Sequence, residues 1–220
     1  MNVAVSYGKF STGRSGGARE SLLTLLNGLA GERSMSADVF QTPPADDPPE
    51  MGFEYRTYTR DIRGVPKLTW TSQVVERLQW DRFMRRQISA DHDLLVTQNR
   101  LAPASVRVAA ELGVPSLFFV RSLALTGYEK YTADRGHLAS IRSTDLGGRV
   151  QYPFLWKNFR DYGRAANEAT DLIANSEFTA RRLASLFDAD SRVIYPPIER
   201  SKYRVEYDPS GYITMVNPRA

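Results

Sequence analysis

The fold is decided by the glycine-rich stretch Gly13-Arg14-Ser15-Gly16-Gly17-Ala18, which separates a short apolar run from a leucine-rich segment. The apolar run over 2–6 predicts a buried strand, and the leucines over 22–29 repeat at the helical spacing i, i+3, i+4 and i+7. Strand, glycine turn and helix in this order favour phosphate binding, because glycine lets the backbone approach a ligand and the first turn of a helix attracts anions. The candidate phosphate-binding residues are therefore Gly13, Arg14, Ser15, Gly16 and Gly17. A tight turn without a ligand is the alternative.

Apolar runs and helical segments alternate through the rest of the chain. We expect further strands over 37–41, 53–59, 93–97, 115–120, 171–174, 192–195 and 212–216. We expect further helices over 72–89, 103–112, 153–169 and 177–187. This alternation predicts an α/β fold, a Rossmann-like open parallel sheet with helices on both faces. The strand over 53–59 alternates aromatic with polar residues, which is typical of a strand nearer the sheet edge.

The composition narrows the class of protein. The chain has 220 residues, of which 42% are hydrophobic and 25% charged, as in ordinary soluble globular proteins. It contains no cysteine, which excludes disulfides and thiolate chemistry. It has no run of about 18 apolar residues that would span a bilayer, and the apolar start is too short for a signal peptide. We therefore expect a cytoplasmic protein.

Five motifs, in the same order and spacing, carry a family resemblance. They are Gly16-Gly17-Ala18-Arg19-Glu20, Leu94-Leu95-Val96-Thr97-Gln98-Asn99, Asp171-Leu172-Ile173-Ala174-Asn175-Ser176-Glu177-Phe178-Thr179, Arg192-Val193-Ile194-Tyr195-Pro196-Pro197-Ile198 and the strand from Tyr212 to Pro218. Together they resemble the N-terminal half of a family 4, GT-B type glycosyltransferase.

The resemblance implies two Rossmann-like domains with a nucleotide-sugar bound between them. Residues 1–200 would be the acceptor-side domain, and 201–220 a linker and the first strand of a donor-binding domain that continues beyond this sequence. The implied activity is hexose transfer with retention of configuration, weak or absent in this part alone. The implied partners are a nucleotide-sugar donor and an acceptor that is a glycan, a lipid-linked sugar or a small molecule. No tightly bound cofactor is expected, and no visible site requires a divalent ion.

The resemblance also identifies residues at the cleft. Arg121 follows the strand 115–120 where many members of the family have a histidine, which makes it the candidate catalytic residue with an unassigned role. The other candidate acceptor or cleft residues are Gln98, Asn99, Tyr128 and Ser176. For Gln98 and Asn99 the alternative is loop capping, and Ser176 also stands where a helix N-cap is expected.

Three other readings stay open. The basic and aromatic segment with Arg77, Trp80, Arg82, Phe83, Arg85 and Arg86 can mark a helix that lies on an anionic membrane. The net charge of +4 permits nucleic-acid binding, which no motif supports. The chain can also be a non-catalytic binding module or one subunit of a split transferase. His92 and His137 are too far apart in sequence to argue a metal site, and we expect His92 at the surface.

Overall fold

The computed structural model describes residues 1–8, 17–43, 49–98, 100–121, 141–142 and 145–197. Several sequence-based candidates lie outside the described residues, namely Gly13, Arg14, Ser15, Gly16, Asn99, Tyr128, His137 and all of 201–220.

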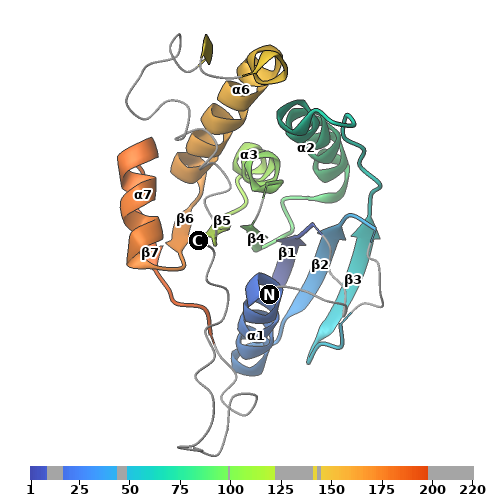
Figure 1. Cartoon of the computed structure of the whole chain (residues 1–220). Coiled ribbons are helices and arrows are strands. Elements are labelled where there is room, and N and C mark those ends of the chain that lie inside the picture. Colours follow the sequence, from blue (N-terminus) through green and yellow to red (C-terminus); the bar gives the residue numbers. More distant parts are fainter. Residues whose placement is uncertain (9–16, 44–48, 99, 122–140, 143–144, 198–220) are drawn as a thin grey trace, which may run out of the picture.

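Strands and helices alternate along the described chain (Figure 1). In chain order they are β1 (Asn2–Ser6), α1 (Gly17–Glu32), β2 (Ser36–Gln41), β3 (Glu54–Thr59), α2 (Thr69–Gln87), β4 (Leu94–Gln98), α3 (Ala102–Leu112), β5 (Ser116–Val120), α6 (Leu146–Glu168), β6 (Asp171–Ala174), α7 (Glu177–Phe187) and β7 (Arg192–Val193).

The strands of the described residues form one seven-stranded sheet in the order β3-β2-β1-β4-β5-β6-β7. Every neighbouring pair is parallel, with Val5 of β1 opposite Val39 on one side and Val96 on the other. The sheet is the α/β, Rossmann-like arrangement that the sequence predicts, and β3 lies at its edge as expected. The chain builds outward from β1 in both directions, so the strand order reverses between β1 and β4.

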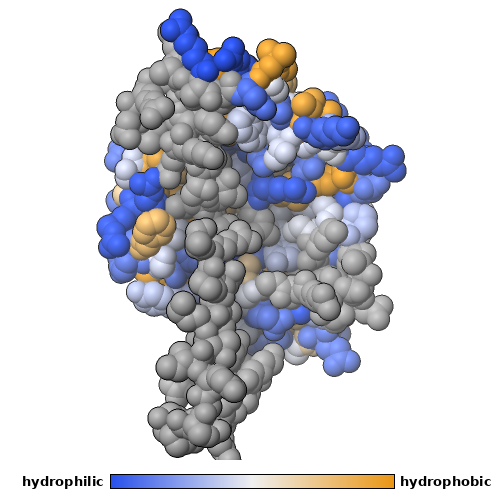
Figure 2. Space-filling model, viewed as in Figure 1, coloured by the Kyte–Doolittle hydropathy of each residue, from blue (hydrophilic) through white to orange (hydrophobic). Residues whose placement is uncertain are grey.

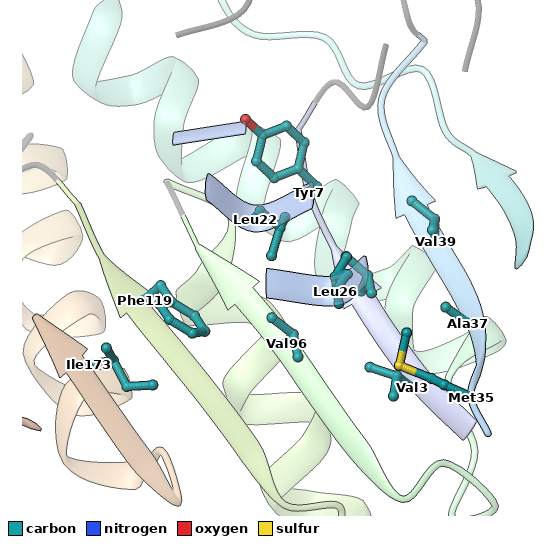
Figure 3. Close-up of a cluster of buried hydrophobic side chains, with 11 residues drawn as sticks. Val3, Tyr7, Leu22, Leu26, Met35, Ala37, Val39, Val96, Phe119 and Ile173 are labelled. Atoms are coloured by element: carbon teal, nitrogen blue, oxygen red, sulfur yellow. The ribbon is translucent and has the colours of Figure 1, made fainter. Parts of the chain in front are cut away.

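Helix α1 covers one face of the sheet through the cluster drawn in Figure 3. Leu22 and Leu26 of α1, one turn apart, are buried with Val3, Val39 and Val96 of the strands below. Each fully buried leucine contributes about 1.5–3 kcal/mol relative to an exposed one. This contact holds the first turn of α1 over the carboxyl ends of the central strands.

Helices α2, α3 and α6 cover the opposite face. Trp80 of α2 is fully buried, and its Nε1 donates to Oγ of Ser105 in α3 (2.9 Å). Arg77 of α2 is also buried and donates to Oδ1 of Asn158 in α6. In the basic and aromatic segment of α2, Arg77 and Trp80 are therefore buried, whereas Arg82, Arg85 and Arg86 are exposed.

Most element boundaries lie within three residues of the sequence-based expectation, and two of the differences have a structural reason. Helix α6 begins at Leu146 rather than at Pro153, because the Asp145 carboxylate caps it by accepting from the Gly148 N–H (2.7 Å). Strand β7 ends at Val193 rather than at Tyr195. The Ile194 N–H still donates to the Ala174 carbonyl (2.9 Å), but Pro196 and Pro197 beyond it have no N–H to extend the ladder.

Candidate functional site

The carboxyl ends of the strands lie along one edge of the sheet, which we call the carboxyl edge. Open α/β sheets bind ligands at this edge, where the strand order reverses. Gln98 ends β4, Arg121 follows β5, Ser176 precedes α7, and Gly17 begins the helix after β1. The structure thus brings these four sequence-based candidates to the same edge.

Arg121 is held at the carboxyl edge by several elements. Its Nε donates to Oε1 of Gln98 in β4 (2.6 Å), and its Nη1 donates to Oγ of Ser21 in α1. The centre of its guanidinium lies 5.3 Å from the centre of the Phe119 ring, within range for cation–π attraction. Its backbone oxygen accepts from Nδ2 of Asn175 after β6 (2.9 Å). The side chain therefore has a defined position before any ligand binds.

The charge of Arg121 has no carboxylate partner among the described residues. Burial lowers the pKa of Arg121 from its ordinary value, and Tyr7 acts in the opposite direction. Arginine stays protonated in proteins even so. A half-buried cation held by neutral groups is poorly compensated, which favours binding of an anion beside it.

Gln98 has a second polar atom that is not used within the described chain. Its Oε1 accepts from Arg121, which leaves the amide nitrogen as a donor. That Nε2 atom is buried and has no hydrogen-bond partner among the described residues. A ligand with an acceptor oxygen would satisfy it.

Arg19 is a second buried cation, in the first turn of α1. It is 6% exposed, and its Nη2 donates to Oε1 of Glu20 (2.7 Å). Its Nε and Nη1 are buried without a hydrogen-bond partner in the described part of the chain. Arg19, Leu22 and Leu26 are spaced i, i+3 and i+7, so Arg19 lies on the sheet-facing side of α1, one turn nearer the carboxyl edge than Leu22.

The two remaining described candidates differ in what they do. Gly17 is exposed, and a Cβ on it would meet no atom within 4 Å, so the fold itself does not require glycine there. Ser176 caps α7, since its Oγ accepts from the backbone N–H of Thr179 (3.2 Å). Its hydroxyl therefore has a structural role whether or not a ligand is present.

A small pocket of about 20 Å³ lies between α1 and the carboxyl ends of β5, β6 and β7. Its polar lining residues among those described are Ser21, Arg121 and Asn175. The rest of the described lining is apolar and comprises Leu25, Phe119, Val120, Ile173, Ile194, Tyr195, Pro196 and Pro197. Figure 3 shows Phe119 and Ile173 side by side on the α1 face of the sheet. The pocket is thus an apolar space with a guanidinium on its wall.

Sequence reasoning missed Arg19, Ser21 and Asn175. Arg19 had a readable signal, a charge in register with the buried leucines of its helix. Ser21 and Asn175 had none, because their roles come from contact with Arg121, which is 100 and 54 residues away in sequence.

His92 is buried, not at the surface as expected. Its Nε2 lies 3.2 Å from Oδ2 of Asp38, and its ring packs edge-on against Phe40. Asp93, the next residue, accepts from the backbone N–H of Asn2, which puts the histidine near the amino ends of the strands. Within the described residues no group of three or more histidines or carboxylates is placed to hold a metal, and no helix there is long and apolar enough to cross a membrane.

The parallel sheet, with its strand order reversed between β1 and β4, is a Rossmann-like α/β fold. The model of Glycosyltransferase Family 4 matches residues 15–202, and the chain belongs to this family. A search of curated proteins finds no match.

Solved structures share the fold at low identity. A UGT transferase from Siraitia grosvenorii, in complex with UDP, has 16% identity and a TM-score of 0.50, covering 88% of this chain and 50% of its own. UGT2 of Phytolacca americana, complexed with UDP-2-fluoro-glucose and pterostilbene, has 13% identity and a TM-score of 0.52, and the match covers 88% of this chain and 52% of that structure. UGT89C1 of Arabidopsis thaliana, complexed with UDP, has 16% identity and a TM-score of 0.50, and the match covers 92% of this chain and 54% of that structure. The chain thus spans about half the length of these structures.

Proposed function

We propose that this chain is the acceptor-side domain of a retaining glycosyltransferase that transfers a hexose from a nucleotide-sugar. The observation that carries the proposal is Arg121, a half-buried guanidinium fixed at the carboxyl edge by Gln98 and Ser21 with no carboxylate partner in the described chain. A nucleoside diphosphate is the anion that the family's reaction releases. Retention of configuration rests on the family resemblance alone.

In this proposal the edge stabilises the departing diphosphate. When the bond from the anomeric carbon to the diphosphate oxygen breaks, the electron pair stays with the diphosphate. Donors that are already fixed and partly desolvated lower the energy of that charge more than water does. The donors of this kind in the described chain are Arg121, the open Nε and Nη1 of Arg19, and Nε2 of Gln98. The proposal adds Gly17 and the glycine stretch before α1, which lies outside the described residues, as further phosphate ligands.

The acceptor would bind beside this anion site. The pocket next to Arg121 encloses only about 20 Å³, so it would take the end of an acceptor and not the whole molecule. Its lining is mostly apolar, which favours an acceptor with a ring or an alkyl group over a plain glycan. No protein nucleophile is part of the proposal, and no divalent ion is required from this domain.

The domain assignment is part of the same proposal. Residues 1–200 would form the acceptor side, and 201–220 would lead into a second domain that holds most of the donor. We take UDP-hexoses as the first donors to test, because the similar structures were solved with UDP or UDP-sugars. A cytoplasmic location stays a prediction.

The test uses the full-length protein that contains this chain. We expect release of nucleoside diphosphate with at least one donor from a panel of UDP-, GDP- and ADP-hexoses. Arg121→Met should lower kcat/KM by about 100-fold or more, the usual loss for one donor to a developing anion. Arg56→Met, which removes an arginine with a 75% exposed side chain on β3, should leave activity unchanged.

Two results would separate the alternatives. No diphosphate release with any donor of the panel would refute the enzyme proposal. Release that requires a separately added partner chain would instead identify a split transferase, in which this chain is the acceptor-binding subunit.

A further inference from the structure

The solvent-facing side of α6 exposes apolar residues near the start of the helix and basic residues further along it. Its first turns expose apolar side chains, with Leu146 at 77% and Val150 at 63% exposure. Its later turns expose basic residues on the same side, because these residues follow the apolar ones at steps of three and four positions. We call this set the α6 stripe: Leu146, Val150, Pro153, Lys157, Arg160 and Arg164, all exposed. At 1.5 Å per residue it is about 27 Å long.

The stripe has an excess of positive charge. Lys157 pairs with Asp161 (3.0 Å) and Arg164 pairs with Glu168 (2.6 Å), but Arg160 has no ion pair among the described residues. Arg149, between the two exposed apolar residues in sequence, is also exposed, and its Nη2 donates to the backbone oxygen of Arg142 (3.0 Å). The exposed Asp145 caps the start of the helix, so the excess of positive charge lies in the later turns, at Arg160.

The core does not require the apolar part of the stripe. The opposite side of α6 carries the buried Tyr152 and Leu155, which pack with Trp70 of α2. Two hydrogen bonds fix the same contact: Trp70 N–H to Oε1 of Gln151 (3.1 Å), and Nδ2 of Asn158 to the Trp70 carbonyl (3.0 Å). Leu146 and Val150 therefore stand in solvent on a helix that is anchored from behind.

The exposed apolar end lies at the carboxyl edge. Because α6 leads into the parallel strand β6, it runs back along the sheet and must begin at the edge where the strands end. Figure 1 shows the start of α6 at that end of the molecule, and Figure 2 shows hydrophobic side chains exposed there beside hydrophilic ones. The stripe and the candidate site thus face the same end.

We propose that the α6 stripe docks on the surface of an anionic phospholipid bilayer. Leu146 and Val150 enter the boundary between headgroups and acyl chains, while Arg160 and its basic neighbours contact the phosphates. A helix with an exposed apolar portion beside basic residues has this mode of binding, and each surface cation adds attraction to anionic lipid. Nucleic acid would engage the cations but gives the exposed leucine and valine no apolar partner.

The test is sedimentation of the 220-residue chain with lipid vesicles. We expect binding to phosphatidylcholine vesicles that contain phosphatidylglycerol, weaker binding at high salt, and little binding to phosphatidylcholine alone. Leu146→Ser with Val150→Ser should weaken binding by about tenfold or more, and Arg160→Gln by about fivefold. The matched control is Leu112→Ser, an exposed leucine at the end of α3 that should bind as the parent chain does.

A second readout reports insertion directly. The fluorescence that Val150→Trp adds to that of the three native tryptophans should be quenched by brominated lipid, whereas the fluorescence that Leu112→Trp adds should not. Equal quenching at both positions, or equal loss of binding in the double variant and in Leu112→Ser, would overturn the proposal. So would duplex DNA binding that the double variant retains, together with no binding to anionic vesicles. The vesicle assays need no nucleotide-sugar, so their outcome is independent of the transferase proposal.

Discussion

Replacing Arg19 by methionine tests whether the carboxyl edge is built for an anion. In the free chain, Nε and Nη1 of Arg19 are buried without partners in the described structure, and each unmade hydrogen bond of this kind costs about 1–3 kcal/mol. The ion pair that the substitution removes is with Glu20, whose side chain is 47% exposed, so it contributes at most about 1 kcal/mol. Methionine keeps the length and flexibility of the side chain without the charge. We therefore expect Arg19→Met to raise the free energy of unfolding by about 1–3 kcal/mol.

Urea unfolding measures this difference. For a chain of this size the m-value is about 2–3 kcal/mol/M, so a gain of about 2 kcal/mol moves the midpoint up by about 0.8 M. Inorganic pyrophosphate at ten times its dissociation constant should stabilise the parent chain by about 1.4 kcal/mol and the variant by much less. The matched control is Arg164→Met, where the lost side chain is 68% exposed and the urea midpoint should stay where it is in the parent chain.

One pattern of results would refute this reasoning. If Arg19→Met lowered the unfolding free energy by more than about 1 kcal/mol, the unpartnered donors would not be a cost. If pyrophosphate then stabilised the parent chain and the variant equally, Arg19 would be a structural cation. The anion site would in that case have to rest on Arg121 alone.

Three further outcomes are expected from urea unfolding. Gly163→Ala should destabilise the chain by about 1–3 kcal/mol, because the new Cβ would lie 2.5 Å from Cδ1 of Phe187. The control, Gly28→Ala, is in open space within α1 and should stabilise the chain by about 0.5–1 kcal/mol. Equal effects of the two substitutions would contradict the packing of α6 on α7. Ser176→Ala should cost about 1 kcal/mol through the lost cap, and a loss of pyrophosphate binding as well would show that the hydroxyl contacts the ligand. Burial raises the pKa of Tyr162, so above about pH 10 this tyrosine ionises in the unfolded chain before it does in the folded one, and the free energy of unfolding falls. Tyr162→Phe should make that fall shallower. An unchanged dependence of stability on pH would contradict the prediction.

The sequence predicts the sheet well because its strands and α1 follow simple periods. Leu22 and Leu26 have one environment, the sheet below them, so their spacing is readable. Helix α2 contacts three different surroundings: the sheet, α3 and α6. It packs on the sheet through Trp80 and on α3 and α6 through charged residues, such as Asp81 with Arg107 and Arg77 with Asp161. Hydrophobic periodicity cannot describe a helix that is buried by ion pairs on two sides.

The site is less predictable, because strand ends can be read from sequence and contacts between them cannot. The position of Arg121 after a strand puts it at the carboxyl edge without any knowledge of the fold. What fixes its orientation is Gln98 on the neighbouring strand and Ser21 on α1, which meet only when the sheet forms. The burial of His92 was missed for the same reason, since Asp38 reaches it from β2 across 54 residues.

Arg121 differs in its pairing from the buried and half-buried arginines of α2 and α3. Arg107 of α3 pairs with Asp81, and Arg77 of α2 lies 3.3 Å from Asp161. A fold that needs only internal stability neutralises its cations in this way, because an uncompensated buried charge is costly. At the edge, Arg121 is instead held by neutral hydrogen-bond acceptors, so its position is fixed while its charge stays available. A negatively charged ligand beside Arg121 would explain why this arginine, unlike Arg107 and Arg77, has no carboxylate partner in the described chain.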